Sequence, residues 1–219
     1  MLFQFKMREA VDCEITPTEI GKRCPSWFYM TDSDYFIDLK DVKLFENSKE
    51  SLEKYPLMSR FFNYQYTRFL VDLFHELPRI ACSIPIDIFA HIDTLDKSEL
   101  LLDRIFNEEK FTATQKAIEN NIYENLINVG YFIQLPSNIS CRFFHVNNEI
   151  ILRYDVSGHD EDGTPWWTAT KGEYRLSYQD FIAEIDDLLN RFFARMDRQV
   201  EDVIKFFTLE EGRKFKYCC

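Results

Sequence analysis

Residues 159–162, His-Asp-Glu-Asp, are the side chains of this sequence best suited to chemistry. A histidine beside carboxylates can bind a metal ion or exchange protons during catalysis. The spacing Asp-x-Asp-Gly over residues 160–163 is also that of the first half of a calcium-binding loop. In that alignment the first ligand position falls on Gly158 and the last on Ala169, where a calcium loop needs an acid and a glutamate. The sequence therefore predicts a solvated loop here, without a bound metal.

Other motifs that carry chemistry are missing from the sequence. It has no His-x-x-x-His pair, no Cys-x-x-Cys pair, no glycine-rich phosphate loop and no Gly-x-Ser-x-Gly elbow. We therefore predict no catalytic, cofactor-binding or metal-binding residues. Scattered Ser, His and Asp side chains can still converge in a fold, so an enzyme or a small-ligand sensor of unknown chemistry is the alternative.

Residues 149–187 form an acidic segment that could bind a partner. It holds ten acidic and three basic side chains, a net charge of −7 in a chain whose total is −11. Trp166 and Trp167 lie inside it; on a strand, one indole would face the core and the other solvent or a partner. Tryptophan is common among residues that dominate binding energy. The predicted partner-binding residues are Asp155, Asp160, Glu161, Asp162, Trp166, Trp167 and Glu173.

Two plainer interpretations of this segment stay open. The acidity can serve only to keep the protein soluble, and both tryptophans can simply cover the end of a sheet. The overall charge of the chain still indicates which class of partner it could bind. A pI of about 4.9 argues against direct nucleic-acid binding, which needs clustered Lys and Arg. It favours attraction to a basic protein.

The location predicted from the sequence is the cytoplasm. No apolar run approaches the roughly 20 residues that span a bilayer, so we expect no membrane contact. Residues 1–8 lack the continuous apolar core of a signal peptide. The spacing of the six cysteines suggests reduced thiols rather than a disulfide framework. Nothing in the sequence sets an oligomeric state.

Hydrophobic periodicity predicts strands at both ends of the chain and helices between them. Asn147-Asn148 suits a hairpin turn because asparagine tolerates positive φ. Ser177 is expected to cap a long C-terminal helix, with Asp180 at its third position, and Pro78 to end an earlier one. The predicted strands are 2–8, 27–30, 35–39, 42–45, 140–146, 149–156, 166–170 and 173–176, with a turn at 31–34 and a loop at 12–25. The predicted helices are 58–77, 100–106 and 112–129, the last ended by Gly130, and the C-terminal helix, whose buried stripe is Phe181, Ile185, Leu188, Phe192, Met196, Val203 and Phe207.

This order of elements predicts an α+β fold in a single domain, residues 1–219. The N-terminal and C-terminal strand groups are expected to join in one mainly antiparallel sheet. That sheet would pack against the helical middle and the long C-terminal helix. No segment between the groups has the composition of a domain linker.

Two groups of motifs resemble an uncharacterised bacterial family of small acidic proteins, a domain of unknown function. The first group is Ser-Trp-Phe-x-Met-Thr-Asp at 26–32, Tyr-x-Ile-Asp at 35–38 and Leu-Phe at 44–45. The second is Arg-Tyr-Asp at 153–155, Asp-Gly-x-Pro-x-Trp-Thr-Ala at 162–169, Gly-Glu at 172–173 and Phe-x-x-Glu at 181–184. The helical middle shows no match.

The resemblance implies a function without chemistry of its own. Such proteins are similar to immunity proteins encoded near bacterial toxins, so we expect a cytoplasmic inhibitor of a cognate toxin domain. The toxin would be delivered by contact-dependent growth inhibition or a similar system, and many such toxins are basic nucleases. An acidic inhibitor can imitate the charge of the nucleic acid, and charge complementarity accelerates association.

The incomplete calcium loop gives a first prediction. Adding calcium or zinc should leave the melting temperature of the protein nearly unchanged, because the outer ligand positions carry no donor side chain. Thermal unfolding with and without each ion measures this. A saturable rise in melting temperature would overturn the prediction and favour a metal-dependent enzyme.

Overall fold

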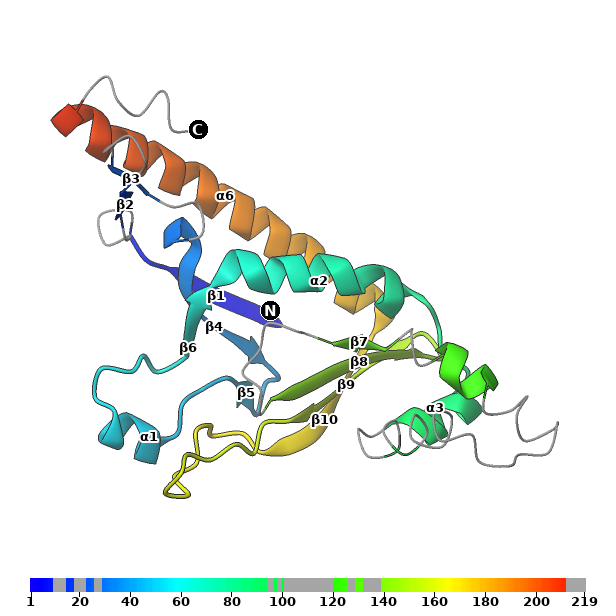
Figure 1. Cartoon of the computed structure of the whole chain (residues 1–219). Helices are drawn as coiled ribbons and strands as arrows, with labels where there is room; N and C mark the ends of the chain where they lie inside the picture. The colour runs from blue at the N-terminus through cyan, green and yellow to red at the C-terminus, as the bar shows by residue number, and fades with distance from the viewer. Residues whose placement is uncertain are drawn as a thin grey trace. The chain divides into compact units, whose positions relative to one another are not determined.

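A computed structural model describes residues 1–9, 15–17, 23–25, 29–93, 97, 100, 120–125, 129–131 and 139–211. The chain divides into two compact units (Figure 1). The first unit comprises Met1–Leu70, Gly158–Ala169 and Ile182–Cys219, and the second comprises Val71–Ser157 and Thr170–Phe181. The expectation of a single domain stays a prediction.

The first unit is built on a four-stranded antiparallel sheet around β4 (Asp32–Asp38). Strands β1 (Phe3–Met7), β5 (Lys43–Leu44) and β6 (Phe62–Gln65) all pair with β4. Burial alternates along β4: Ser33, Tyr35 and Ile37 are buried, and the residues between them are partly exposed. This period of two places one face of the sheet in the core.

Aromatic side chains fill that core. Tyr35 makes ring contacts with Phe45, Phe62, Tyr66 and Phe69, at centroid distances of 5.2–6.1 Å. These residues come from two strands, a turn and a helix, so the contacts join segments distant in sequence. Ring pairs of this kind add to the area that they bury.

The long helix α6 (Tyr178–Glu211) packs on β1 along the part that belongs to the first unit. Arg191 donates a hydrogen bond to the Phe3 carbonyl (2.7 Å) and pairs with Asp187 (2.7 Å). Phe192 makes an edge contact with Phe5 (6.2 Å). The predicted helix is confirmed, as is its cap: the Asp180 N–H donates to Ser177 Oγ (3.0 Å). The predicted stripe is buried from Phe181 to Met196; the side chains of Val203 and Phe207 lie outside the described residues.

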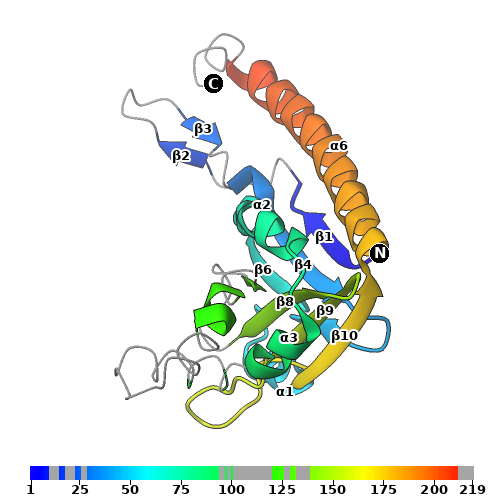
Figure 2. The same ribbon diagram turned by 90° about the vertical axis from the view of Figure 1, so that its right-hand side faces the viewer.

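The second unit contains a separate four-stranded antiparallel sheet (Figure 2). Its order is β10 (Lys171–Ser177), β9 (Glu149–Asp155), β8 (Ser140–Val146) and β7 (Gly130–Tyr131). The predicted hairpin joins β8 and β9, and Asn147 and Asn148 have φ of 49° and 64°. Helix α3 (Ile86–Ile92) packs on one face of the sheet, where Phe89 meets Phe144 (5.2 Å).

The α+β class and the antiparallel pairing are therefore confirmed, but the joined sheet is wrong. The two strand groups form separate sheets, and 15–17 with 23–25, predicted as loop, form a third pair, β2 (Ile15–Pro17) with β3 (Arg23–Pro25). Hydrophobic alternation shows which face of a strand is buried and does not choose the strand beside it. Long-range backbone pairing decides how strands group.

The predicted helix 58–77 is wrong at both ends. Residues 49–54 form α1 (Lys49–Lys54), 62–65 form β6, and α2 (Tyr66–Ala81) starts afterwards. The aromatic pair Phe61 and Phe62 fits a helical period, yet β6 pairs with β4 and buries part of Phe62 against Tyr35. Pro78 lies inside α2 near its C-terminal end, where few helical hydrogen bonds remain to be lost.

Some shorter segments also differ from their predicted structure. Tyr29–Thr31 form a 3₁₀ helix, η2, rather than a strand, and the expected turn at 31–34 lies mostly within β4. Segment 166–170 forms no regular strand, although Trp167 makes one antiparallel bridge with Asn47. Gly130 begins β7, where a Cβ would lie 2.3 Å from Ile80 Cγ1, so only glycine fits.

Most of the predicted helices 100–106 and 112–129 lies outside the described residues, with Leu100 and residues 120–125 helical. Residues 27 and 28 also lie outside them. None of the helices in the described part of the chain combines the length and the apolar character that a bilayer crossing requires.

Two adjacent phenylalanines on α6 test its packing. Phe192 is 5% exposed and Phe193 is 56% exposed. Phe192→Ala should lower the free energy of unfolding by about 3–5 kcal/mol, the usual loss for a packed core Phe. Phe193→Ala should change it by about 0.5 kcal/mol or less, as surface substitutions do. Urea denaturation of both variants measures the difference, and equal losses would contradict the packing described here.

Candidate functional site

The predicted site residues at 160–167 lie on one loop of the first unit, residues 158–169, here called the Asp160 loop. The loop runs beside α1 and the segment before it (Figure 1). The Ser48 N–H donates to the Trp166 carbonyl (2.9 Å), and the Thr168 N–H donates to the Glu46 carbonyl (2.9 Å). These two bonds frame the bridge between Asn47 and Trp167. A short antiparallel pairing thus joins segments more than 100 residues apart.

The start of α1 is built to receive this loop. Ser48 is the N-cap, with extended backbone, and its Oγ accepts the Ser51 N–H (3.0 Å). The hydroxyls of Ser48 and Ser51 both donate to the Pro165 carbonyl, the latter at 2.8 Å. The capping residues of α1 therefore also hold the loop.

Asp160 fixes the other end of the loop. Its Oδ2 accepts hydrogen bonds from Lys54 Nζ (2.7 Å) and the Tyr55 hydroxyl (3.2 Å). Its Oδ1 accepts the backbone N–H groups of Asp162 (3.0 Å) and Thr164 (2.9 Å). Four donors thus surround a side chain that is only 7% exposed. Such charge-assisted bonds are the strong ones.

The ionised form of Asp160 is strongly favoured. The Lys54 hydrogen bond, supported by the backbone N–H groups of Thr164 and Asp162, lowers the pKa of this carboxyl from its ordinary 3.8 to about 2, although desolvation opposes the shift. The hydrogen bonds that Lys54 donates to Asp160 and Asp162 raise the pKa of Lys54 in turn. An ammonium group therefore occupies the side of Asp160 that a metal ion would need. Among the described residues, no three or more His, Cys, Asp or Glu side chains gather so that they could hold a metal ion.

The two tryptophans lie in different surroundings. Trp167 is 8% exposed and makes edge contacts with Phe45 (6.2 Å) and Phe62 (5.9 Å). Trp166 is partly exposed and stacks on Tyr55, with ring centroids 5.4 Å apart and planes 18° apart. One indole therefore faces the core while its neighbour reaches the surface.

Sequence reasoning missed Tyr55, which stacks on Trp166, and Leu57, which follows it two residues later. Tyr55 lies in a turn closed by the Met58 N–H, which donates to the Tyr55 carbonyl (2.9 Å). Leu57, in the same turn, is fully exposed. In the sequence, an apolar residue beside a proline only weakly indicates an exposed apolar side chain in a turn. Nothing in the sequence indicates that Tyr55 stacks on Trp166. We call Tyr55, Leu57, Glu161, Asp162 and Trp166 the loop–α1 surface.

The two acids of the loop–α1 surface lie in different surroundings. Asp162 is exposed and forms an ion pair with Lys54 (2.6 Å). Glu161 is exposed at the tip of the loop, beside Gly163, whose φ of 82° lets the chain turn. Glu161 is therefore the acid of this loop best placed to meet a partner.

The other two predicted residues, Asp155 and Glu173, lie in the second unit. Asp155 accepts hydrogen bonds from the Ser157 hydroxyl and N–H, and the hydroxyl bond chiefly lowers its pKa. Glu173 is held between Arg175 (2.6 Å) and Arg153 (2.8 Å). Desolvation works against ionisation of Glu173, but these two guanidinium groups outweigh it and lower its pKa.

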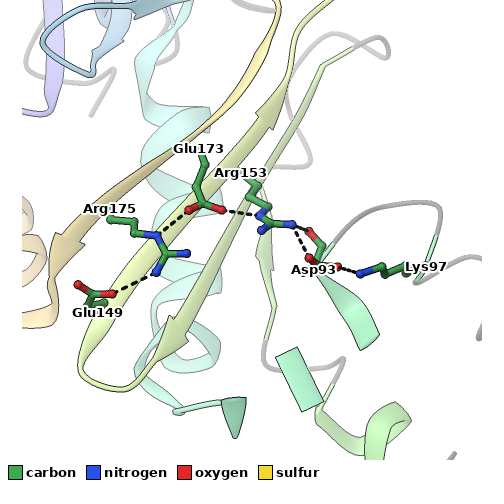
Figure 3. A network of polar contacts seen from close by, with 6 residues as sticks. All are labelled: Asp93, Lys97, Glu149, Arg153, Glu173 and Arg175. Atoms are coloured by element: carbon green, nitrogen blue, oxygen red, sulfur yellow. Dashed lines mark hydrogen bonds and ion pairs between the residues drawn. The ribbon is translucent and has the colours of Figure 1, made fainter. Parts of the chain in front are cut away.

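Glu173 is part of a chain of alternating charges on β9, β10 and the end of α3 (Figure 3). Arg175 also reaches Glu149 (3.3 Å), and Arg153 reaches Asp93 (2.7 Å), which binds Lys97 (2.6 Å). Three acids face three bases, so the network is neutral. Two of the ten acids of residues 149–187, Glu149 and Glu173, are therefore paired within this network. The structure places the predicted residues in two groups, 160–167 in the first unit and Asp155 with Glu173 in the second.

The model of a family of unknown function, DUF5984, matches residues 2–209. The resemblance to an uncharacterised family is thereby confirmed, and the match also spans the helical middle. No curated protein and no solved structure matches the chain.

The Asp160 contacts predict a pH-dependent loss of stability. A carboxyl whose pKa is depressed on folding stabilises the protein above its unfolded pKa, and this is lost as the pH falls through the folded pKa. Asp160→Asn should therefore lower the melting temperature at pH 5–7, and its difference from wild type should shrink between about pH 4 and pH 2. Glu161→Gln is the matched control and should differ little from wild type at any pH. A difference for Asp160→Asn that does not change with pH would show that the ionised carboxylate is not what holds the loop.

Proposed function

This chain belongs to the DUF5984 family of unknown function, and we propose that it is an immunity-type protein that binds and neutralises a cognate bacterial toxin domain. The proposed partner has a basic surface, as a nuclease domain does, and meets the inhibitor in the cytoplasm of the protected cell. The observation that carries the proposal is the loop–α1 surface, where fixed apolar groups lie beside exposed acids. Occluding a toxin in this way requires binding alone.

The apolar part of the surface supplies an anchor. Leu57 is fully exposed, and Trp166 presents part of its indole while the stack on Tyr55 holds its orientation. Tryptophan and tyrosine dominate the binding energy of many interfaces when a partner covers them. Leu57 lies in the same turn as Tyr55, two residues further along the chain, and adds a fully exposed apolar side chain there.

The loop is held before any partner arrives. Ser48 and Ser51 hold the Pro165 carbonyl, and Lys54 with Tyr55 holds Asp160. A surface already fixed in its bound form loses less conformational entropy on association, which favours affinity. This support indicates separate roles for the predicted residues. Asp160 and Trp167 position the loop. Glu161, Asp162, which also pairs with Lys54, and the exposed part of Trp166 would contact the partner.

The charge of the chain fits a basic partner. The net charge is −11, and Glu161 and Asp162 add exposed negative charge beside the apolar patch. Complementary potentials steer encounter and speed association, and like charges disfavour acidic partners. A basic nuclease domain, whose active site attracts phosphate, would meet both an acid rim and an aromatic anchor.

A charge-reversal variant and two alanine variants should separate the contribution of the acids to binding kinetics from that of the apolar side chains. The partner to test is the toxin domain encoded beside this gene, in a catalytically inactive form, measured by surface plasmon resonance. Glu161→Lys should lower the association rate and weaken its dependence on salt, because exposed rim charges act mainly on encounter. Leu57→Ala and Trp166→Ala should raise the dissociation rate, with a loss of about 2 kcal/mol if Trp166 is a hot spot.

Matched controls are available in the same unit. Asp186→Lys makes the same charge change at an exposed position on α6, and Phe193→Ala removes an exposed aromatic ring from that helix. Both should bind nearly as wild type. If all variants bind alike, the interface lies elsewhere on the chain. If the wild type neither binds the toxin domain nor restores growth when the active toxin is co-expressed, the immunity function itself is wrong.

A further inference from the structure

The strand β10 forms one edge of the sheet of the second unit (Figure 2). It is seven residues long, and four of them, Lys171, Gly172, Glu173 and Arg175, are exposed. Among the described strands only β9 pairs with it. An edge of this length is a template for another strand.

The register of β10 with β9 shows which backbone groups face outward. The Val156 N–H donates to the Thr170 carbonyl (2.6 Å), and the Tyr178 N–H donates to the Asn148 carbonyl (2.9 Å). Between these two points the pairing is continuous, without a bulge. Hydrogen-bonded pairs alternate with non-hydrogen-bonded ones, so the even residues of β10 bond to β9. The N–H and C=O groups of Lys171, Glu173 and Arg175 therefore point away from the sheet.

We propose that a second copy of this chain pairs with this edge, β10 antiparallel to β10, to form a symmetric dimer. With Tyr174 on the two-fold axis, Glu173 of each copy lies opposite Arg175 of the other. The outward backbone groups of one strand then meet those of its partner, because odd residues face odd residues. Opposite charges placed across an antiparallel pair stabilise it.

The neighbouring registers are excluded by charge or by backbone. Moving the centre to Glu173 or Arg175 places two like charges directly opposite each other, which is destabilising. Moving it by half a residue sets outward backbone groups against inward ones, so the ladder cannot form. Of the registers centred on Glu173, Tyr174 and Arg175, only the one centred on Tyr174 sets opposite charges across the two strands.

The other face of β10 fits the same register. Tyr174 would meet its own copy at a non-hydrogen-bonded position, where Cα atoms are about 4.5 Å apart and aromatic pairs form well. Leu176 would lie opposite Gly172, over which the ring of Tyr154 already lies in the same chain. The two four-stranded sheets would then continue into one. This edge, with balanced charge, suits two copies of a chain that otherwise repel through a net charge of −11 each.

A charge-exchange experiment tests the pairing. Analytical ultracentrifugation of the wild type over a range of concentrations should show a monomer–dimer equilibrium. Glu173→Arg alone faces Arg175 with arginine, and Arg175→Glu alone faces Glu173 with glutamate, so each should raise the dimer Kd at least about tenfold. An equimolar mixture of the two variants pairs arginine with glutamate at both positions and should bring the Kd back to within about threefold of wild type.

A cross-linking test guards against variants that fail to fold. Tyr174→Cys should give a disulfide-linked dimer under mild oxidation, because the pair on the axis has the Cα spacing that a disulfide needs. Leu176→Cys, which faces Gly172 of the other copy, should give no more dimer than the wild type, whose own cysteines set the background. Mass spectrometry identifies the 174–174 link. A wild type that stays monomeric, equal linking by both variants, or a mixture no tighter than its components would overturn the proposal.

Discussion

The Asp160 carboxylate is the group on which the geometry of the candidate site depends. It accepts bonds from Lys54 and Tyr55 on one oxygen and from two backbone N–H groups on the other. These contacts place Trp166 on Tyr55 and leave Glu161 at the tip of the loop. An acid that in the sequence resembles a ligand or a partner contact is thus an internal support. The residues around it gain their position, and so their capacity to bind, from this one ion.

Pairing within the chain also changes how the charge of −11 acts. On β9 and β10, Glu149 and Glu173 are matched by Arg175 and Arg153, so that this surface is polar but balanced. The tip of the Asp160 loop keeps unmatched charge at Glu161. Two surfaces with different electrostatics follow. We propose a basic partner for the loop–α1 surface and a second copy of β10 for the β10 edge.

Local chemistry made part of this structure predictable. The Asn147-Asn148 turn, the Ser177 cap and the stripe along α6 depend on residues within a few positions of one another, and all are confirmed. The grouping of strands was not predictable, because β6 pairs with β4 across residues 39–61, which contain β5 and α1. The candidate site shows the same limit. Its acids and tryptophans stand out in the sequence, but the bond from Lys54 to Asp160 joins residues 106 positions apart, and no local pattern announces it.

Hydrogen exchange tests the central claim most directly, because it reports which backbone amides a partner covers. The protein would be measured alone and in complex with the proposed toxin partner. The account predicts slower exchange in residues 48–58 and 158–169, with their amides among the most strongly protected on binding. Unchanged exchange in both segments, with protection confined to other parts of the chain, would contradict it.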